Sequence, residues 1–205
     1  MGSEMCQRAT TAYHEAGHAV IADYYRVWTD GIRMERDEID SSWNGALRID
    51  RALANPEVSI PIGIAGPLAE AKFMATCRMN DDVKFAIRDN MSSLASDIVA
   101  WNDRDEIEHQ VSFVSDKSEE KFAVNFSDDI ARLKKSRVPL YTGTLITAFF
   151  DVRKLFDDNT HWKLVKVLAN HLVTQPARRV QQVSICGKTL AMFLEMEKQK
   201  LSKEE

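Results

Sequence analysis

The chain has 205 residues, of which 44% are apolar and 28% are charged, and this composition is typical of a folded globular protein rather than a disordered one. With only 8 glycines and 5 prolines it has few of the residues that tight turns need, so we expect a mainly helical α+β fold and not an all-β sandwich. A net charge of −4 gives no basic field for binding nucleic acid, and no apolar run reaches the roughly 20 residues of a membrane span.

The cysteines and the N-terminal region indicate the compartment. No basic-then-apolar secretory pattern occurs in the first 30 residues. Cys6, Cys77 and Cys186 are odd in number and lack CxxC spacing, which favours reduced thiols over a disulfide framework or a thiolate zinc site. We therefore expect a cytoplasmic protein with no nucleic acid partner and no membrane span.

The first half of the chain predicts a helix, a hairpin and a proline-containing helical segment. Apolar residues at three- and four-residue spacing predict an amphipathic helix over 10–28. Alternation over 32–36 and 46–50 predicts a small β-hairpin. Residues 56–76 are rich in alanine but hold two interior prolines, so we expect two short helices or one helix kinked near Gly66-Pro67.

The second half predicts further helices. Asn80 or Asp81 can cap a long helix that ends at about 102, and the acidic stretch 103–120 is typical of a solvated linker or helix surface. The remaining periodic segments predict helices over 127–136, 139–157, 162–173 and 185–200.

The most informative motif is HExxH, within the segment TAYHEAGHAV at residues 11–20. Residues four apart lie one helical turn apart, so His14 and His18 can bind the same zinc ion. Glu15 is adjacent and can accept a proton from a water molecule on the metal. In a chain of this composition, chance predicts roughly 0.01 such matches.

The residues around the motif support a helix. Thr10 or Thr11 can stabilise its start. Gly17 costs about 1 kcal/mol in a helix interior, which indicates that something packs closely against it.

A catalytic zinc ion keeps three protein ligands and one water, so a third ligand is needed. The residues after His18 do not continue as HExxHxxGxxH, and this ligand must be remote in sequence. Two of the candidate histidines, His161 and His171, are more simply interpreted as helix-surface or capping residues. The candidates are Glu70, Asp81, Asp82, His109, His161 and His171.

The segment TAYHEAGHAVI resembles the zinc-binding helix of the protease domain of FtsH-type, ATP-dependent zinc metalloproteases. The resemblance continues in order. NGAL at 44–47 is similar to the edge strand beside that family's active site, and IAGPLAE at 64–70 to its glycine-pair, Ala-Glu helix. MNDDVKFA at 79–86 is similar to its Ser-Asn-Asp-Leu segment, whose aspartate is the third zinc ligand.

This resemblance covers residues 9–101, with three departures from the family pattern: Ala65, Pro67 and Asn80. It implies a single peptidase domain over 1–205, of zincin type, with a zinc-site half at 9–101 and a C-terminal helical part at 102–205.

The function that the resemblance implies is a zinc-dependent metalloendopeptidase that hydrolyses flexible or unfolded polypeptides. His14, His18 and Asp82 would bind Zn²⁺ and Glu15 would be the catalytic base. An extended substrate would add as a strand to the edge near residues 45–47.

The family joins its protease to an ATPase module, but the chain lacks the nucleotide-binding loop GxxxxGK[ST]. Its nearest fragment is Gly187-Lys188-Thr189, where Gln182 occupies the position of the first glycine and no strand is expected before it, so we interpret it as a helix start. The expected partner is a polypeptide substrate, and a separate ATPase or a second copy of the chain stays open.

Two other functions compete with the peptidase. One is a non-proteolytic zincin-fold protein that binds peptides or a partner, although such a protein has no physical need of Glu15. The other is a structural zinc domain, which is disfavoured because structural sites are usually closed by four ligands and rich in cysteine.

Overall fold

The computed structural model describes residues 3–38, 42–49, 55–76, 142–176 and 182–203. These residues are mainly helical with one small antiparallel sheet, which confirms the predicted α+β class. In chain order the elements are α1 (Ser3–Tyr24), β1 (Gly31–Arg36), β2 (Trp43–Arg48), α2 (Pro56–Thr76), α5 (Thr142–Asp157), α6 (Asn159–Thr174), β3 (Gln182–Cys186) and α7 (Gly187–Leu201).

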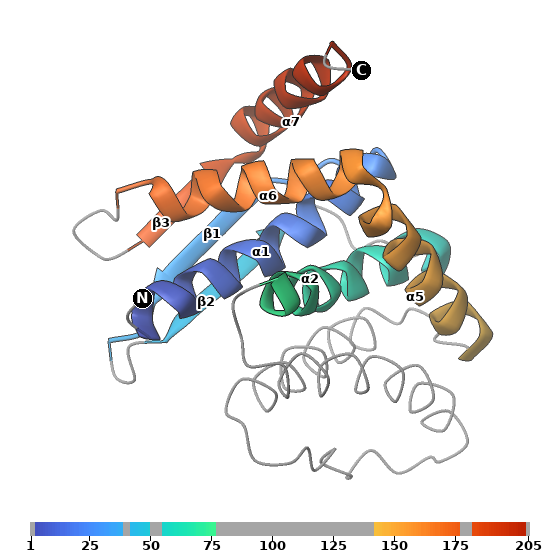
Figure 1. Ribbon diagram of the computed structural model, residues 1–205, viewed down its shortest axis with the longest axis horizontal. Helices are drawn as coiled ribbons and strands as arrows, with labels where there is room; N and C mark the ends of the chain where they lie inside the picture. Colours follow the sequence, from blue (N-terminus) through green and yellow to red (C-terminus); the bar gives the residue numbers. More distant parts are fainter. Residues whose placement is uncertain (1–2, 39–41, 50–54, 77–141, 177–181, 204–205) are drawn as a thin grey trace, which may run out of the picture.

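Helix α1 is the centre of the described fold, since α2, α6 and β2 all pack against it (Figure 1). Tyr13 shows how the helices meet. Its ring stacks on Phe73 of α2 with centroids 4.0 Å apart, and it lies 5.8 Å from the ring of Trp162 on α6. Aromatic packing therefore joins the three helices on the face of α1 beside the histidine motif.

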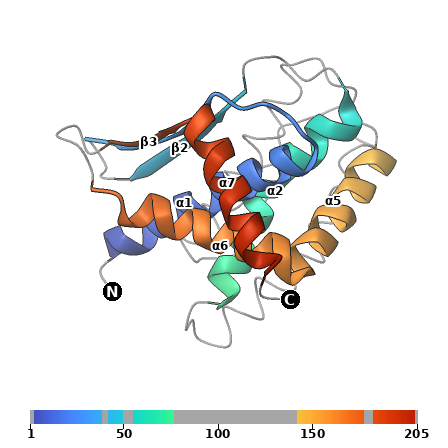
Figure 2. The same ribbon diagram turned by 90° about the horizontal axis from the view of Figure 1, so that it is seen from above.

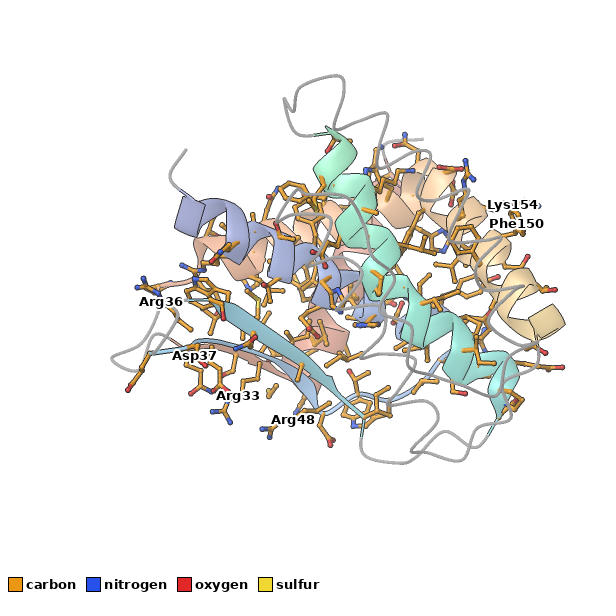
Figure 3. The ribbon with its side chains drawn as sticks, turned by 90° about the horizontal axis from the view of Figure 1, so that it is seen from below. Arg33, Arg36, Asp37, Arg48, Phe150 and Lys154 are labelled. Atoms are coloured by element: carbon orange, nitrogen blue, oxygen red, sulfur yellow. The ribbon has the colours of Figure 1, made fainter. Side chains whose placement is uncertain are left out.

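The sheet has the order β2-β1-β3, and β1 pairs antiparallel with both neighbours. It lies to one side of the helices (Figure 2). Ile32 and Met34 are buried on the helix side of β1, while Arg33 and Arg48 extend from the other face (Figure 3). This is the alternation that the sequence of the hairpin predicts.

Strand β3 is a feature that the sequence analysis missed. The helix predicted over 185–200 begins two residues later, at Gly187, and the expectation that no strand precedes Gly187 was wrong. The strand does alternate, with Val183 and Ile185 buried, but it passes directly into α7 without a turn that would mark its end. Gly187 still starts a helix, and its N–H donates to the Asp30 carbonyl at 2.8 Å.

Helix α1 has different ends from those predicted. It begins at Ser3, because residues 3–9 contain neither proline nor glycine and continue the helix. Thr11 therefore lies inside the helix, where its hydroxyl donates to the Trp43 carbonyl at 3.0 Å. The helix ends at Tyr24, four residues before the predicted end at residue 28. Arg26, two residues after the helix, adopts a positive φ of 57°.

The other boundaries agree more closely with the sequence. Helix α2 is continuous through Pro61 and Pro67, which contradicts two short helices and agrees with one helix, while the kink near Gly66-Pro67 stays a prediction. Helices α5 and α6 match the predictions over 139–157 and 162–173 to within three residues.

The predicted helices over 80–102 and 127–136, the acidic stretch 103–120 and Cys77 lie outside the described residues. In the part that is described, Cys186 is a free thiol, as expected. No helix among the described residues is long and apolar enough to cross a membrane.

Candidate zinc centre

Two histidines of α1 face each other inside the fold. His14 and His18 are 8% and 6% exposed, and their Nε2 atoms lie 3.0 Å apart. The two rings meet edge to face with centroids 4.7 Å apart. The four-residue spacing of HExxH thus brings the two imidazoles together, as the helical interpretation predicts.

The contacts of the two Nδ1 atoms indicate which ring nitrogen of each histidine carries the proton. His14 Nδ1 lies 3.0 Å from Glu70 Oε2, and His18 Nδ1 lies 2.6 Å from the Ile62 carbonyl oxygen. Carboxylate and carbonyl oxygens accept hydrogen bonds, so each Nδ1 is the donor and each Nε2 presents a lone pair. The Gly66 N–H also points at His18 Nδ1, at 3.3 Å, but the shorter 2.6 Å contact needs a proton between Nδ1 and the Ile62 carbonyl, so Nδ1 is the donor.

The arrangement fits a zinc ion. Two histidine nitrogens that bind one zinc at about 2.0–2.1 Å in tetrahedral geometry lie about 3.3 Å apart. The observed 3.0 Å is close to this value, so both nitrogens can reach one cation.

Gly66 lets α2 lie directly against both imidazoles. A Cβ on Gly66 would overlap His18 Nε2 and would lie 2.7 Å from His14 Nε2. A methyl group would therefore push the two rings out of their positions, in which the spacing of the two nitrogen donors suits Zn²⁺.

Glu15 lies under the edge of the sheet. It is 3% exposed, and a Cβ on Gly45 of β2 would lie 2.5 Å from its Oε1 and 2.6 Å from its Cγ. Gly45 is thus the residue that admits the carboxylate beneath β2. The expectation that the hairpin lies beside the helix of the HExxH motif is confirmed.

Gly17 explains how α1 and α2 approach so closely. A Cβ there would lie 2.5 Å from the Ala65 carbonyl oxygen and 2.6 Å from the Ala69 Cβ. The close neighbour that the sequence indicated is therefore the backbone of α2, whose approach brings Gly66 and Glu70 to the histidines.

The described candidates for a third ligand lie elsewhere. Glu70 is on the Nδ1 side of His14, away from the two facing Nε2 atoms. His161 bonds to Asp158 Oδ2 at 2.7 Å and His171 to Gln175 Nε2 at 2.8 Å, which confirms their interpretation as surface or capping histidines.

In the ranges that the structure describes, no group of three His, Cys, Asp or Glu side chains is arranged to hold a metal ion. Asp81, Asp82 and His109 lie outside these ranges, so Asp82 as the third ligand stays a prediction.

Sequence reasoning missed the contact of Glu70 with His14 and the steric roles of Gly45 and Gly66. The signal for Glu70 was a single acidic residue within the otherwise apolar run 60–71, since such a carboxylate is buried only with a partner.

No protein-family model matches this chain, and comparison with curated protein sequences gave no match. The similarity to FtsH-type protease domains therefore rests on the motifs quoted above.

Proposed function

We propose that this protein is a zinc-dependent metalloendopeptidase that cleaves flexible or unfolded polypeptides. The observation that carries the proposal is the pair of buried imidazoles whose Nε2 lone pairs face each other at 3.0 Å, with the buried Glu15 next to them in sequence. This is the residue set that metal-assisted hydrolysis of a peptide bond requires.

His14 and His18 would hold the zinc ion, and the predicted Asp82 would complete its protein ligands. When bound, the ion acts as a Lewis acid that polarises the scissile carbonyl and makes water acidic near neutral pH. Glu15 accepts the proton that the attacking water loses and delivers it to the leaving amine nitrogen as the C–N bond breaks.

Strand β2 suits an extended substrate. In the described sheet it pairs with β1 on one side only, so its other side can pair with an added strand. Because Gly45 of β2 lies against Glu15, a peptide bound along this edge would pass close to the catalytic carboxylate. A folded substrate cannot present its backbone in this way, which supports a preference for unfolded chains.

The proposal is tested with Glu15→Gln, in cleavage of an unfolded casein-type substrate by the zinc-loaded chain. Glutamine keeps the size of the side chain but cannot act as a base, so zinc content and fold should persist. Cleavage should fall about 10²–10⁴-fold, which corresponds to roughly 3–5 kcal/mol of transition-state stabilisation. Zinc content and rate are measured on the same preparation.

His161→Gln is the matched control, because the hydrogen bond of His161 is local, to Asp158, and its ring contacts Tyr24 at the C-terminal end of α1 rather than the histidine motif. It should leave both zinc content and cleavage unchanged. Cleavage by Glu15→Gln within a few-fold of the parent at equal zinc content would contradict the mechanism. A zinc-loaded parent that cleaves no unfolded substrate would favour the peptide-binding alternative instead.

A further inference from the structure

Residues on one face of α2 contact both histidines of the pair. Ile62, Gly66 and Glu70 are spaced by four, so they form one stripe along the helix. Ile62 contacts His18 and Glu70 contacts His14, while Gly66 lies against both rings. The two helices therefore meet in register, and α2 controls both imidazoles from their Nδ1 sides.

The two imidazoles receive different kinds of partner. His18 donates to a backbone carbonyl, which has a second lone pair for its own helix. His14 donates to a carboxylate that is completely buried, and a hydrogen bond to a charged acceptor is roughly twice as strong as one to a neutral acceptor. A side-chain substitution can remove only the second of these contacts.

We propose that Glu70 is a positioning residue for the zinc site, which acts through His14. It fixes the tautomer in which the His14 Nε2 lone pair is directed toward the metal, and it holds the orientation of the ring. It also raises the basicity of the imidazole, which makes Nε2 a stronger ligand for the metal. This inference rests on the proposed function, because it assumes that the two Nε2 atoms bind zinc. It assigns Glu70 to the support of a ligand and not to the ligand set.

Burial of Glu70 also argues against a role in packing alone. An isolated ionised carboxylate inside a protein is strongly unfavourable, and an apolar residue would fill the α2 interior at lower free energy. The hydrogen bond with His14 offsets part of this cost, and the rest of the stripe, Ile62 and Gly66, is apolar.

The experiment measures zinc affinity of the full chain by competition with a chelator, together with the visible spectrum of the chain loaded with Co²⁺ alone. Glu70→Ala removes the acceptor, and loss of a residue that orients a metal ligand typically weakens metal binding 10–100-fold, which is the expected result. Glu70→Gln keeps an acceptor of the same size without the charge, so it should recover part of the affinity. The Co²⁺ absorption bands should shift in Glu70→Ala because the ring of His14 is free to turn.

Ser59→Ala is the matched control, because it removes a hydrogen bond of a buried side chain on the same helix, 2.9 Å to the Asn55 carbonyl, away from the histidines. It should keep the zinc affinity and the Co²⁺ spectrum of the parent. Should Glu70→Ala fail to fold, Glu70→Gln carries the test, with a weaker affinity expected.

Zinc affinity and Co²⁺ spectrum of folded Glu70 variants equal to those of the parent would overturn the positioning role and leave the peptidase proposal intact. The same loss in Ser59→Ala would also overturn it, since the effect would then be general to α2. A parent that binds no zinc would overturn both proposals. A zinc-binding parent without cleavage, in which Glu70→Ala weakens zinc, would overturn only the peptidase.

Discussion

Helices α1 and α6 each carry two histidines, and the two pairs differ in where their partners lie. His14 and His18 of α1 bond to groups on α2 that are 56 and 44 residues away in sequence. His161 and His171 of α6 bond to Asp158 and Gln175, three and four residues away. The same residue type thus forms a buried pair with long-range hydrogen bonds on α1 and local hydrogen bonds near the helix ends on α6. The long-range contacts of the α6 pair are ring contacts, of His161 with Tyr24 and of His171 with Phe193.

The hydrogen bond between His161 and Asp158 on α6 affects the pKa of Asp158. Asp158 is the N-cap of α6, and the hydrogen bond from His161 is the main cause that lowers its pKa. A lowered carboxyl pKa means that this contact stabilises the fold above the pKa of the unfolded chain, and that the stabilisation is lost as the pH falls through the folded value. Because Asp158 is exposed, solvent screening keeps this contribution small.

The largest expected effect tests this contrast directly. His14→Ala or His18→Ala should abolish stoichiometric zinc binding, because each removes one of the two facing nitrogen donors. His161→Ala and His171→Ala should keep the zinc content of the parent. Metal analysis of the four purified variants gives the measurement, and zinc loss in an α6 variant equal to that in an α1 variant would break the distinction between the two pairs.

The sequence predicted the α1 pair because HExxH encodes its geometry within one helix. His14 and His18 come together as predicted, and even the close packing at Gly17 was indicated by the cost of glycine in a helix. The parts that it did not predict depend on register between elements. Glu70 contacts His14 only because α2 packs against α1 in one particular register. In the same way, the absence of a side chain at Gly45 makes room for Glu15 only because of the position of β2 against α1.

Strand β3 was missed for a related reason. Its five residues gain their stability from pairing with β1, which precedes it by about 150 residues in the chain. The periodicity of a single sequence does not show which distant strand a segment pairs with. The adjoining α7 has a clear helical pattern, and it led us to extend the helix back to residue 185.

The next prediction concerns the third ligand. Asp82→Ala should lose stoichiometric zinc, whereas Glu70→Ala should still fill with zinc at saturating concentration, because Glu70 acts on the far side of His14. Zinc content is measured on both variants at matched, saturating metal. Full occupancy in Asp82→Ala with loss in Glu70→Ala would instead identify Glu70 as a ligand and contradict the placement of both residues.

Alanine variants at two glycines distinguish an effect on zinc affinity from an effect on the packing of α1 against α2. Gly66→Ala places a methyl group beside both Nε2 atoms, and overpacking of this kind typically costs about 1–3 kcal/mol, so zinc binding should weaken about 10–100-fold. Gly17→Ala overlaps the α2 backbone at Ala65 instead, so its cost should appear in the free energy of unfolding of the zinc-free chain.

Both glycine variants are measured by chelator competition and by urea denaturation without zinc. Helical propensity favours alanine over glycine by about 1 kcal/mol, which limits any loss of stability in Gly66→Ala. The parent's zinc affinity in Gly66→Ala would show that the close approach of Gly66 to the imidazoles does not matter for metal binding.

The smallest effect comes from the C-terminal ends of the two helices. Helix α6 ends with Gln175 in an unstrained extended conformation, whereas α1 ends with Arg26 at φ 57°. The bonds from the Val27 N–H to the Ala22 carbonyl and from the Arg26 N–H to the Asp23 carbonyl form the helix-ending motif in which glycine usually occupies this left-handed position.

Arg26→Gly should therefore stabilise the chain, because glycine adopts the left-handed conformation without the Cβ repulsion of about 1–2 kcal/mol that other residues incur. Part of this gain is offset by the greater conformational freedom of glycine in the unfolded chain, which leaves a net increase of about 0.5–1 kcal/mol in the free energy of unfolding. Urea denaturation gives the measurement, with Gln175→Gly as the matched variant at the end of α6. Gln175→Gly should destabilise, because its backbone is already unstrained, so the added freedom is a loss, and because the side-chain hydrogen bond to His171 is removed as well. Equal changes in the two variants would show that the positive φ of Arg26 carries no strain, and that the two helices end alike in energy.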